Sequence, residues 1–495
     1  MKALIYISAC SLLLLGSCNK FLDEDSSGFI SPDNYYKTEA QVQAAVNGAY
    51  TGLDDIFITN LGVATSPAFV TEYLTGYSTR LRPAGFEENQ FLRLDYIDPA
   101  NGLLEYWWKA LYYPVENCNS VIDNLSRSNI LTEAAKKKYM GEVYFLRAWY
   151  YFMGVQLFGD IPLKITPTTD LSNTRIPKAS QEKVYEQIVA DLALAEQSGL
   201  PWTDASGHIS LGAVKSLLAK VYISMAGYPL QKGQRYYQLA YEKAREVIDS
   251  RSFALFASYA DLRKQSLQNT GEHIFMLQRD AITAGNILHF FLMPFPDLPI
   301  TIQPAYGGAL APHPDFYNAY APDDQRRQEQ VFFISRYPEY KNAGNTITLP
   351  DPMLFKYWDT QAEVSGKSGL NFSWIRYADI LLLCAEARAR MDGGTTTDAT
   401  ALEAYQQVRQ RAFPGSTAPA QLSVNTVLKE RFLELCFEWQ TWFDMIRTRK
   451  ALNTGTGGIV DLIGFQAPNH VKAFTEKDLQ LPIPLSEVQK NPLLK

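Results

Sequence analysis

The sequence predicts a mainly α-helical protein in which paired helices support a loop-rich, irregular half. Between residues 35 and 253, and again between 374 and 450, apolar residues recur three and four positions apart, which is the spacing of one helix face. Between residues 253 and 373 this periodicity fades, and seven prolines fall within residues 294–322. Proline removes a backbone donor and fixes φ, so we expect loops and short strands there instead of long helices.

Nine segments are predicted to be helical. In order along the chain they are residues 38–53, 102–125, 132–158, 181–197, 211–226, 236–250, 374–392, 399–412 and 424–450. The clearest one begins after Thr132, whose hydroxyl can cap the first turn, and ends at Gly159. The last one carries an apolar stripe along its whole length, so it is predicted as one long helix that packs against neighbours throughout.

Two pairs of these helices share the small-residue pattern of tetratricopeptide repeats. In the first pair Ala219 precedes Ala240 and Ala244, and in the second Ala385 precedes Ala404. A small side chain on one helix lets the next helix approach closely, so we expect antiparallel hairpins. The segments between the helices are longer than in the standard repeat.

The first residues predict export. Lys2 precedes an apolar run of 13 residues, 3–15, which is shorter than the roughly 20 residues that a membrane-spanning helix needs. Small residues directly before Cys18 resemble the cleavage site of bacterial lipoproteins. We therefore predict a lipoprotein signal peptide over residues 1–17, acylation of Cys18 and an acidic tether over 18–30. The alternative is an ordinary secretory signal followed by an incidental cysteine.

Composition argues against nucleic-acid binding and against a metal or other cofactor. The chain has 46 Lys and Arg against 52 Asp and Glu, a formal charge of −6, which gives no field to neutralise phosphates. After the signal peptide and Cys18, only Cys118, Cys384 and Cys436 remain, each in an apolar helical segment, so we expect buried side chains. No His or Cys pair has the spacing of a metal site.

These features together resemble the SusD/RagB family of outer-membrane nutrient-binding lipoproteins. The matching stretches follow the family order: the start from FLDEDSSGF; GEVYFLRAWYYFMGVQLFGDIPL at 141–163; VYEQIVADLALAE at 184–196; GHISLGAVKSLLAKVYISMAG at 207–227; RYADILLLCAEA at 376–387; LKERFLELCFEWQTWFDMIR at 428–447; and LPIPLSEVQKNPLL at the end. Thr441 and Gln406 depart from residues that are common in relatives. Both lie in scaffold motifs.

The resemblance implies a fold and a role. It implies tetratricopeptide-like hairpins below a ligand-facing half, with an N-terminal region over 31–230 and a C-terminal region over 231–495 that contains the loop-rich segment 253–373. It also implies that the protein is displayed on the cell surface, captures oligosaccharides, performs no catalysis and covers a SusC-like TonB-dependent transporter. Acidic residues just after Cys18 are implied to direct this display.

Aromatic loops are the candidate binding residues. Pyranose rings have apolar C–H faces that lie on aromatic planes, while their hydroxyls bind planar polar groups. The segment 73–96 interleaves both kinds, and 289–306 places rings among prolines. The candidates are Tyr77, Arg80, Arg82, Phe86, Asn89 and Tyr96, and in the second segment His289, Phe290 and Tyr306. For any single ring, core packing is the competing interpretation, and we assign Trp107, Trp108, Trp149, Trp439 and Trp442 to the core.

Three glutamates repeat every fourth residue in the last predicted helix: Glu430, Glu434 and Glu438. A glycosidase needs two carboxylates about 5–10 Å apart on opposite sides of a sugar, so carboxylates on one packed helix favour an ion-pair network instead. The arginines considered as partners are Arg147, Arg376, Arg409 and Arg431. Two alternatives to glycan capture stay open: the same fold with a peptide or other cargo or a purely structural lid, and a lipid-anchored glycoside hydrolase.

Overall fold

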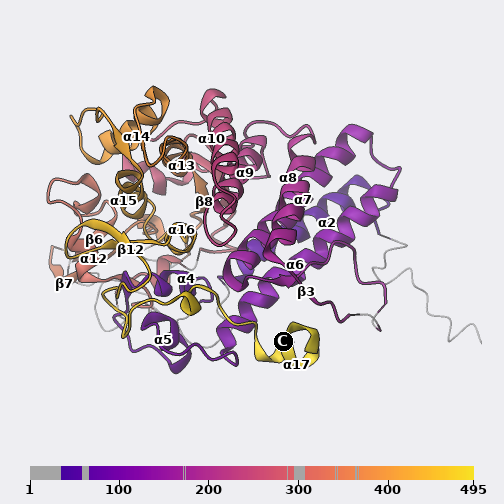
Figure 1. Cartoon of the computed structure of the whole chain (residues 1–495), viewed down its shortest axis with the longest axis horizontal. Helices are drawn as coiled ribbons and strands as arrows, with labels where there is room; N and C mark the ends of the chain where they lie inside the picture. The colour runs from indigo at the N-terminus through magenta and orange to yellow at the C-terminus, as the bar shows by residue number, and fades with distance from the viewer. Residues whose placement is uncertain are drawn as a thin grey trace, which may run out of the picture.

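The computed structural model describes residues 35–57, 66–170, 172, 174–286, 288–294, 307–339, 342, 344–362, 365 and 367–495. Its helices are α2 (Glu39–Tyr50), α3 (Gly52–Asp55), α4 (Phe69–Leu74), α5 (Phe86–Leu92), α6 (Gly102–Arg127), α7 (Glu133–Phe158), α8 (Gln181–Glu196), α9 (Leu211–Ala226), α10 (Gln234–Asp249), α11 (Leu288–Phe291), α12 (Pro314–Asn318), α13 (Tyr377–Met391), α14 (Ala399–Ala412), α15 (Val424–Glu434), α16 (Thr441–Thr448) and α17 (Leu485–Lys490). The prediction of a mainly α-helical fold is confirmed. In Figure 1, α6, α7 and α8 fill one half of the molecule, and α13 to α16 with most of the short strands fill the other.

The strands are short and pair two by two. They are β1 (Ser78–Thr79), β2 (Ile161–Pro162), β3 (Lys178–Ala179), β4 (His273–Leu277), β5 (Ala311–Pro312), β6 (Phe333–Pro338), β7 (Thr346–Leu354), β8 (Phe372–Arg376), β9 (Thr395–Thr396), β10 (Leu422–Ser423), β11 (Lys450–Asn453) and β12 (Gly458–Asp461). The antiparallel pairs are β1–β5, β2–β3, β4–β8, β6–β7, β9–β10 and β11–β12. The described part of residues 253–373 therefore consists of loops, short strands and single helical turns, as its prolines predict.

The predicted helical hairpins are present. Helix α9 packs on α10, α10 on α13, and α13 on α14, which makes one continuous stack in the middle of the molecule. The alanines that suggested close approach, Ala219, Ala240, Ala244, Ala385 and Ala404, are all buried between these helices. Helix α7 begins where Thr132 accepts a hydrogen bond from Ala135 N, and it ends at Gly159 with φ of +72°.

The prediction of one helix over residues 424–450 is wrong. Helix α15 ends at Glu434 and α16 begins at Thr441, because Phe437 and Trp439 adopt left-handed backbone angles between them. Side chains distant in sequence bind the backbone groups that a continuous helix would pair internally. Lys356 Nζ donates to the carbonyls of Glu434 and Cys436 at 2.9 and 3.0 Å.

Two further side chains hold this interruption. The Tyr357 hydroxyl donates to Phe437 O at 2.7 Å, and a carboxylate oxygen of Glu72 accepts from Trp439 N at 2.7 Å. The predicted helix at 374–392 also begins later than expected. Residues 374–376 belong to β8, which pairs with β4, and α13 starts at Tyr377. In both places a tertiary partner overrides the local helical pattern.

One large core joins the two halves. The five tryptophans assigned to the core, Trp107, Trp108, Trp149, Trp439 and Trp442, are all buried, which confirms that assignment. Trp107 and Trp439 donate their indole N–H groups to the carbonyls of Pro67 and Ala68, so these large rings leave no buried donor unpaired. Cys118, Cys384 and Cys436 are free thiols buried in helices or their ends, also as predicted.

Candidate functional site

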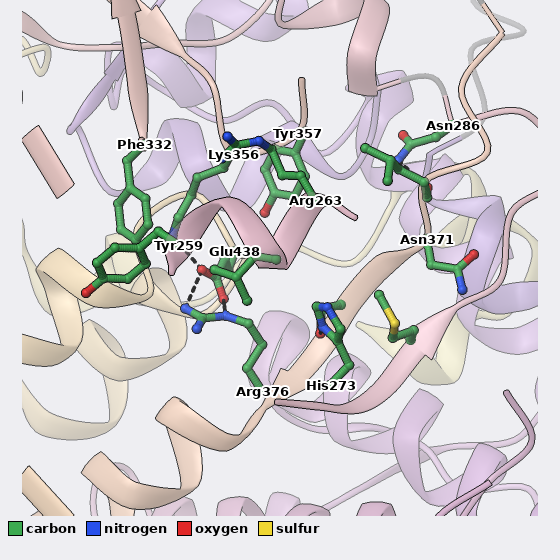
Figure 2. Close-up of a pocket in the computed structure, with 14 residues that line it drawn as sticks. Tyr259, Arg263, His273, Asn286, Phe332, Lys356, Tyr357, Asn371, Arg376 and Glu438 are labelled. Carbon is green, nitrogen blue, oxygen red and sulfur yellow. Dashed lines mark hydrogen bonds and ion pairs between the residues drawn. The ribbon is translucent and has the colours of Figure 1, made fainter. Parts of the chain in front are cut away.

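A buried ion network forms part of the wall of the small cavity in Figure 2. Arg376 binds Glu438 through Nε–Oε2 and Nη2–Oε1 contacts of 2.8 and 2.7 Å, and Lys356 contacts the same carboxylate. Arg411 Nη2 lies 2.9 Å from Glu434 Oε1. Burial alone would raise the pKa of Glu434, but the charges of Arg411 and Arg376 outweigh it and hold the pKa well below its usual range.

The glutamates are thus ion-pair partners, as the sequence predicted, but only part of the predicted arginine set belongs to them. Arg376 pairs with Glu438 and Glu434, and Arg409 Nη1 lies 3.0 Å from Glu430 Oε2. Arg147 pairs instead with Asp191 at 2.6 Å, and Arg431 pairs with Asp379 and Asp444. Arg326, Lys356 and Arg411 complete the network, and they were not among the predicted partners.

The cavity beside this network is too small for a sugar. Its volume is about 40 Å³, whereas pockets for small molecules measure roughly 300–1,000 Å³. Its lining residues Arg376 and Glu438 already bind each other within its wall (Figure 2). The cavity has room for a few water molecules and is part of the support of the fold.

Two exposed aromatic rings mark a different region, the platform segment, which we define as residues 80–98. The Phe86 side chain at the start of α5 is 79% exposed, and Tyr96, four residues after α5 ends, is 72% exposed. Exposed aromatic rings can serve as contacts for a ligand, so this short segment is the candidate contact surface.

Hydrogen bonds fix the platform segment to the beginning of α6. Gln90 Oε1 accepts from the Asp98 backbone N and from Asn101 Nδ2, both at 2.9 Å. Glu87 Oε1 accepts from Gly102 N at 2.9 Å. Several side-chain hydrogen bonds therefore fix the backbone that carries Phe86 and Tyr96.

The start of the platform segment and the strand just before it pair with residues 308–312. Strands β1 and β5 pair with Ser78 opposite Pro312, and Leu81 N donates to Gly308 O at 3.0 Å. Residues that directly follow the second candidate segment, 289–306, thus lie beside the end of the first, although the two are more than 200 residues apart in the sequence. Which of their rings contact a ligand stays a prediction.

Three predicted binding residues are corrected by their burial. Tyr77 is 2% exposed, its ring stacks on Phe316 and its hydroxyl donates to Leu452 O. The Arg80 side chain is buried and pairs with Glu88 at 3.1 Å. His289 is 0% exposed and packs edge-on against Trp358. Each of these side chains is packed in the interior, where it supports the loops, and does not face solvent.

The remaining candidates divide into those the structure describes and those it does not. Arg82 is partly exposed, and Asn89 holds the loop through a 3.2 Å bond from its Nδ2 to Ala84 O. Cys18, Tyr306 and the side chain of Phe290 lie outside the described residues.

A third loop beside the platform segment was missed. Asn469 Nδ2 donates to Ser78 O at 2.9 Å, and Val471 N donates to Arg93 O at 2.8 Å. Gly76 makes this approach possible: it has φ of +71°, and a Cβ there would lie 2.4 Å from Ala467 Cβ. The signal in the sequence was only Gly464 and Pro468 in a segment without periodicity.

The described ranges contain no group of three His, Cys, Asp or Glu side chains arranged to hold a metal ion. Within the same ranges, none of the helices combines the length and the apolar character that crossing a bilayer requires.

Comparison with known proteins identifies the family. Residues 20–223 match the family described as "Starch-binding associating with outer membrane", and residues 301–495 match the SusD family. A SusD-like protein, P2, from Formosa agariphila is 25% identical over 97% of this chain and 96% of its own. Among solved structures, a SusD superfamily protein from Parabacteroides distasonis has a TM-score of 0.85 and 32% identity, covering 92% of this chain and 98% of its own.

A more distant structure shares the fold. Surface glycan-binding protein A from Bacteroides thetaiotaomicron, solved in complex with laminarihexaose, has a TM-score of 0.73 and 21% identity and covers 92% of this chain and 98% of its own. The fold and the relatives define a helical binding protein that is not an enzyme. The chain belongs to the SusD family.

Proposed function

We propose that this chain is a lipid-anchored protein of the outer-membrane surface that captures glycans and passes them to a SusC-like TonB-dependent transporter. Family membership supports the role, and the relative solved with laminarihexaose supports the ligand class. The observation in this chain that carries the proposal is the pair of exposed rings, Phe86 and Tyr96, on a fixed segment. Aromatic faces of this kind stack on the C–H faces of pyranoses.

The platform suits a chain-like ligand. Its two rings lie at the protein surface, so it can receive an inner part of a polysaccharide as well as an end. Arg82 and Arg93 lie in the same segment, and both have exposed surface, so they can supply donors to sugar hydroxyls. An open platform with few contacts per sugar unit gives modest affinity and rapid release, which suits a protein that hands its ligand on.

Removing the platform rings should weaken glycan binding. Phe86→Ala and Tyr96→Ala are each expected to lower the affinity about tenfold, since one stacked ring contributes on the order of 1.4 kcal/mol. Affinity electrophoresis in gels that contain plant, algal or microbial polysaccharides identifies a ligand, and calorimetry with its oligosaccharides measures the change.

The matched control is Tyr113→Ala, which removes another exposed tyrosine, on α6 and outside the platform segment, and should leave binding unchanged. Two results would contradict glycan capture at the platform. One is that none of the polysaccharides retains the unaltered protein. The other is that a double variant with both Phe86→Ala and Tyr96→Ala binds as well as the unaltered protein.

The anchor gives a second prediction. Cys18→Ala should move the protein from the membrane fraction to a soluble fraction, because the acyl chains on that thiol supply the attachment. Fractionation of cells and mass spectrometry of the N-terminal peptide check this. Cys10→Ala, which alters a cysteine of the signal peptide, should leave the protein in the membrane. Membrane retention of the Cys18 variant would contradict lipid anchoring.

A further inference from the structure

A second hollow lies among the helix ends, and it shares no residue with the platform segment. It lies between the ends of α7 and α9, the beginning of α8, the end of α16 and the C-terminal segment that leads to α17. Its volume is about 230 Å³. A neighbouring hollow of about 330 Å³ is also lined by Gln181 and Gln480, so the two adjoin. Together they fall within the roughly 300–1,000 Å³ of small-molecule pockets.

The hydroxyl of Tyr185 is the first sign that this hollow binds something. Tyr185 lines it and is only 3% exposed, yet within the described ranges no group hydrogen-bonds its hydroxyl. The hydroxyl oxygen is accessible from the hollow, so its partner must be water or a ligand that lies there. Burial raises the pKa of Tyr185, so the hydroxyl keeps its proton and can donate.

An aromatic ring with a cation on it forms the rim. Tyr228 is 41% exposed, and the guanidinium carbon of Arg449 lies 4.7 Å from its ring centroid. Arg449 Nη2 is itself held 2.9 Å from Glu476 Oε2. An aromatic ring beside an arginine and a carboxylate is the set of groups that binds the C–H face and the hydroxyls of a sugar.

Three amides add hydrogen-bonding capacity. Gln156 donates its Nε2 group to Phe152 O, and Gln480 donates its Nε2 group to Phe158 O. The Oε1 atoms of both side chains can then accept hydrogen bonds from a ligand in the hollow. The side-chain amide of Gln181 makes no hydrogen bond to the described part of the chain. Donors and acceptors thus line the same hollow, as a polyhydroxylated ligand requires.

The charges of the hollow favour a neutral ligand. Arg447 is bound by Glu386 and Asp444 at 2.6–2.8 Å, and Arg449 by Glu476. Each arginine of the 230 Å³ hollow therefore already has its counter-ion. The adjoining hollow is lined by one cation and one anion, Lys178 and Asp160, so the formal charges balance there as well.

We propose that this hollow is a second binding site, which takes one or two units of a neutral saccharide. The ligand class rests on the proposed function, but the site itself rests on Tyr185, Tyr228 and the three amides. The platform presents its rings at the surface and binds along a chain, whereas the hollow is a concave site of limited volume, so it selects a terminal unit or a short product.

The decisive substitution is Tyr185→Phe, which removes only the unpartnered hydroxyl. We expect an unchanged or slightly raised melting temperature, because no internal hydrogen bond is lost, and a three- to tenfold weaker affinity for the ligand. The probes are maltose, cellobiose, xylobiose and galactose, with galacturonic acid as the charged comparison, measured by saturation-transfer NMR and titration. The neutral sugars should bind and the acid should not.

Two controls separate this site from the platform and from general damage. Tyr112→Phe removes a buried hydroxyl that does donate, to Pro162 O at 2.8 Å, so it should lower the melting temperature and leave sugar binding intact. The double variant of Phe86 and Tyr96 should lose polysaccharide retention and keep the binding of the small sugars.

The results distinguish the two proposals. Loss of small-sugar binding in Tyr185→Phe, with polysaccharide retention intact, supports the second site. If no small neutral sugar binds, if the charged sugar binds more tightly, or if Tyr185→Phe binds as well as the unaltered protein, the second site is overturned. Polysaccharide retention at the platform would still stand in each of these cases.

Discussion

Replacing Glu434 with alanine is expected to destabilise the protein by about 3–5 kcal/mol, because it removes the anion from a buried network and leaves its cations unpaired. Glu434 lies within 3.3 Å of Arg326, Arg376 and Arg411. All four side chains are buried, so water cannot replace the lost partner.

Urea unfolding followed by circular dichroism measures this loss. Glu434→Gln keeps the shape and one acceptor, so it should be destabilised less than Glu434→Ala. Asp461→Ala is the matched surface control: Asp461 pairs with Lys450 at 2.6 Å in an exposed position, and its removal should change little. If Glu434→Ala unfolds within 1 kcal/mol of the unaltered protein, the network does not stabilise the fold in the way described.

Acidification should destabilise the protein between about pH 6.5 and 4. Burial lowers the pKa of His273, His289 and His470 to about 4, whereas an unfolded histidine titrates near 6.5. The unfolded chain then binds protons that the folded chain does not, so the free energy of unfolding falls as the pH falls through this window. Each histidine contributes up to about 3 kcal/mol to this loss.

Other groups act in the opposite direction. Burial raises the pKa of Glu72 to about 8 and also raises the pKa of Asp55 and Asp191, and the hydrogen bond to the Glu142 carboxylate raises the pKa of His208, so these groups favour the folded state on acidification. The buried histidines outweigh them together with carboxyls whose pKa is lowered by arginines, such as Glu386 and Glu434. Urea titrations at pH 7.5, 5.5 and 4.5 measure the net effect. His470→Gln should show a shallower decline than the unaltered protein. Equal slopes for the two, or constant stability from pH 7.5 to 4.5, would show that burial does not hold these imidazoles neutral.

The fold was predictable wherever local pattern and tertiary packing agree. Helices α6, α7, α8 and α9 lie within two residues of the predicted ranges at both ends, since each has a cap and an apolar stripe. The interruption between α15 and α16 was not predictable. Its causes are Lys356, Tyr357 and Glu72, which lie 78 or more residues away and bind backbone that would otherwise continue the helix.

The site was predictable as a region but not residue by residue. Rings and polar residues alternate in the platform segment, and this pattern does not say which side faces solvent. Phe86 and Tyr96 are exposed, whereas Tyr77 is covered by Phe316 from α12, 239 residues later in the sequence. Arg326 and Lys356 escaped notice for a similar reason, because they lie in loops without a period that could place them next to the glutamates.

The anchoring of α5 to the start of α6 has an energetic consequence for ligand capture. Gln90, Glu87 and Asn101 immobilise the backbone under Phe86 and Tyr96 when the chain folds. A sugar that lands on these rings therefore restricts only side-chain rotation, and little loop entropy is lost on association. A preorganised surface of this kind can bind a ligand through few contacts with higher affinity than a flexible loop with the same contacts.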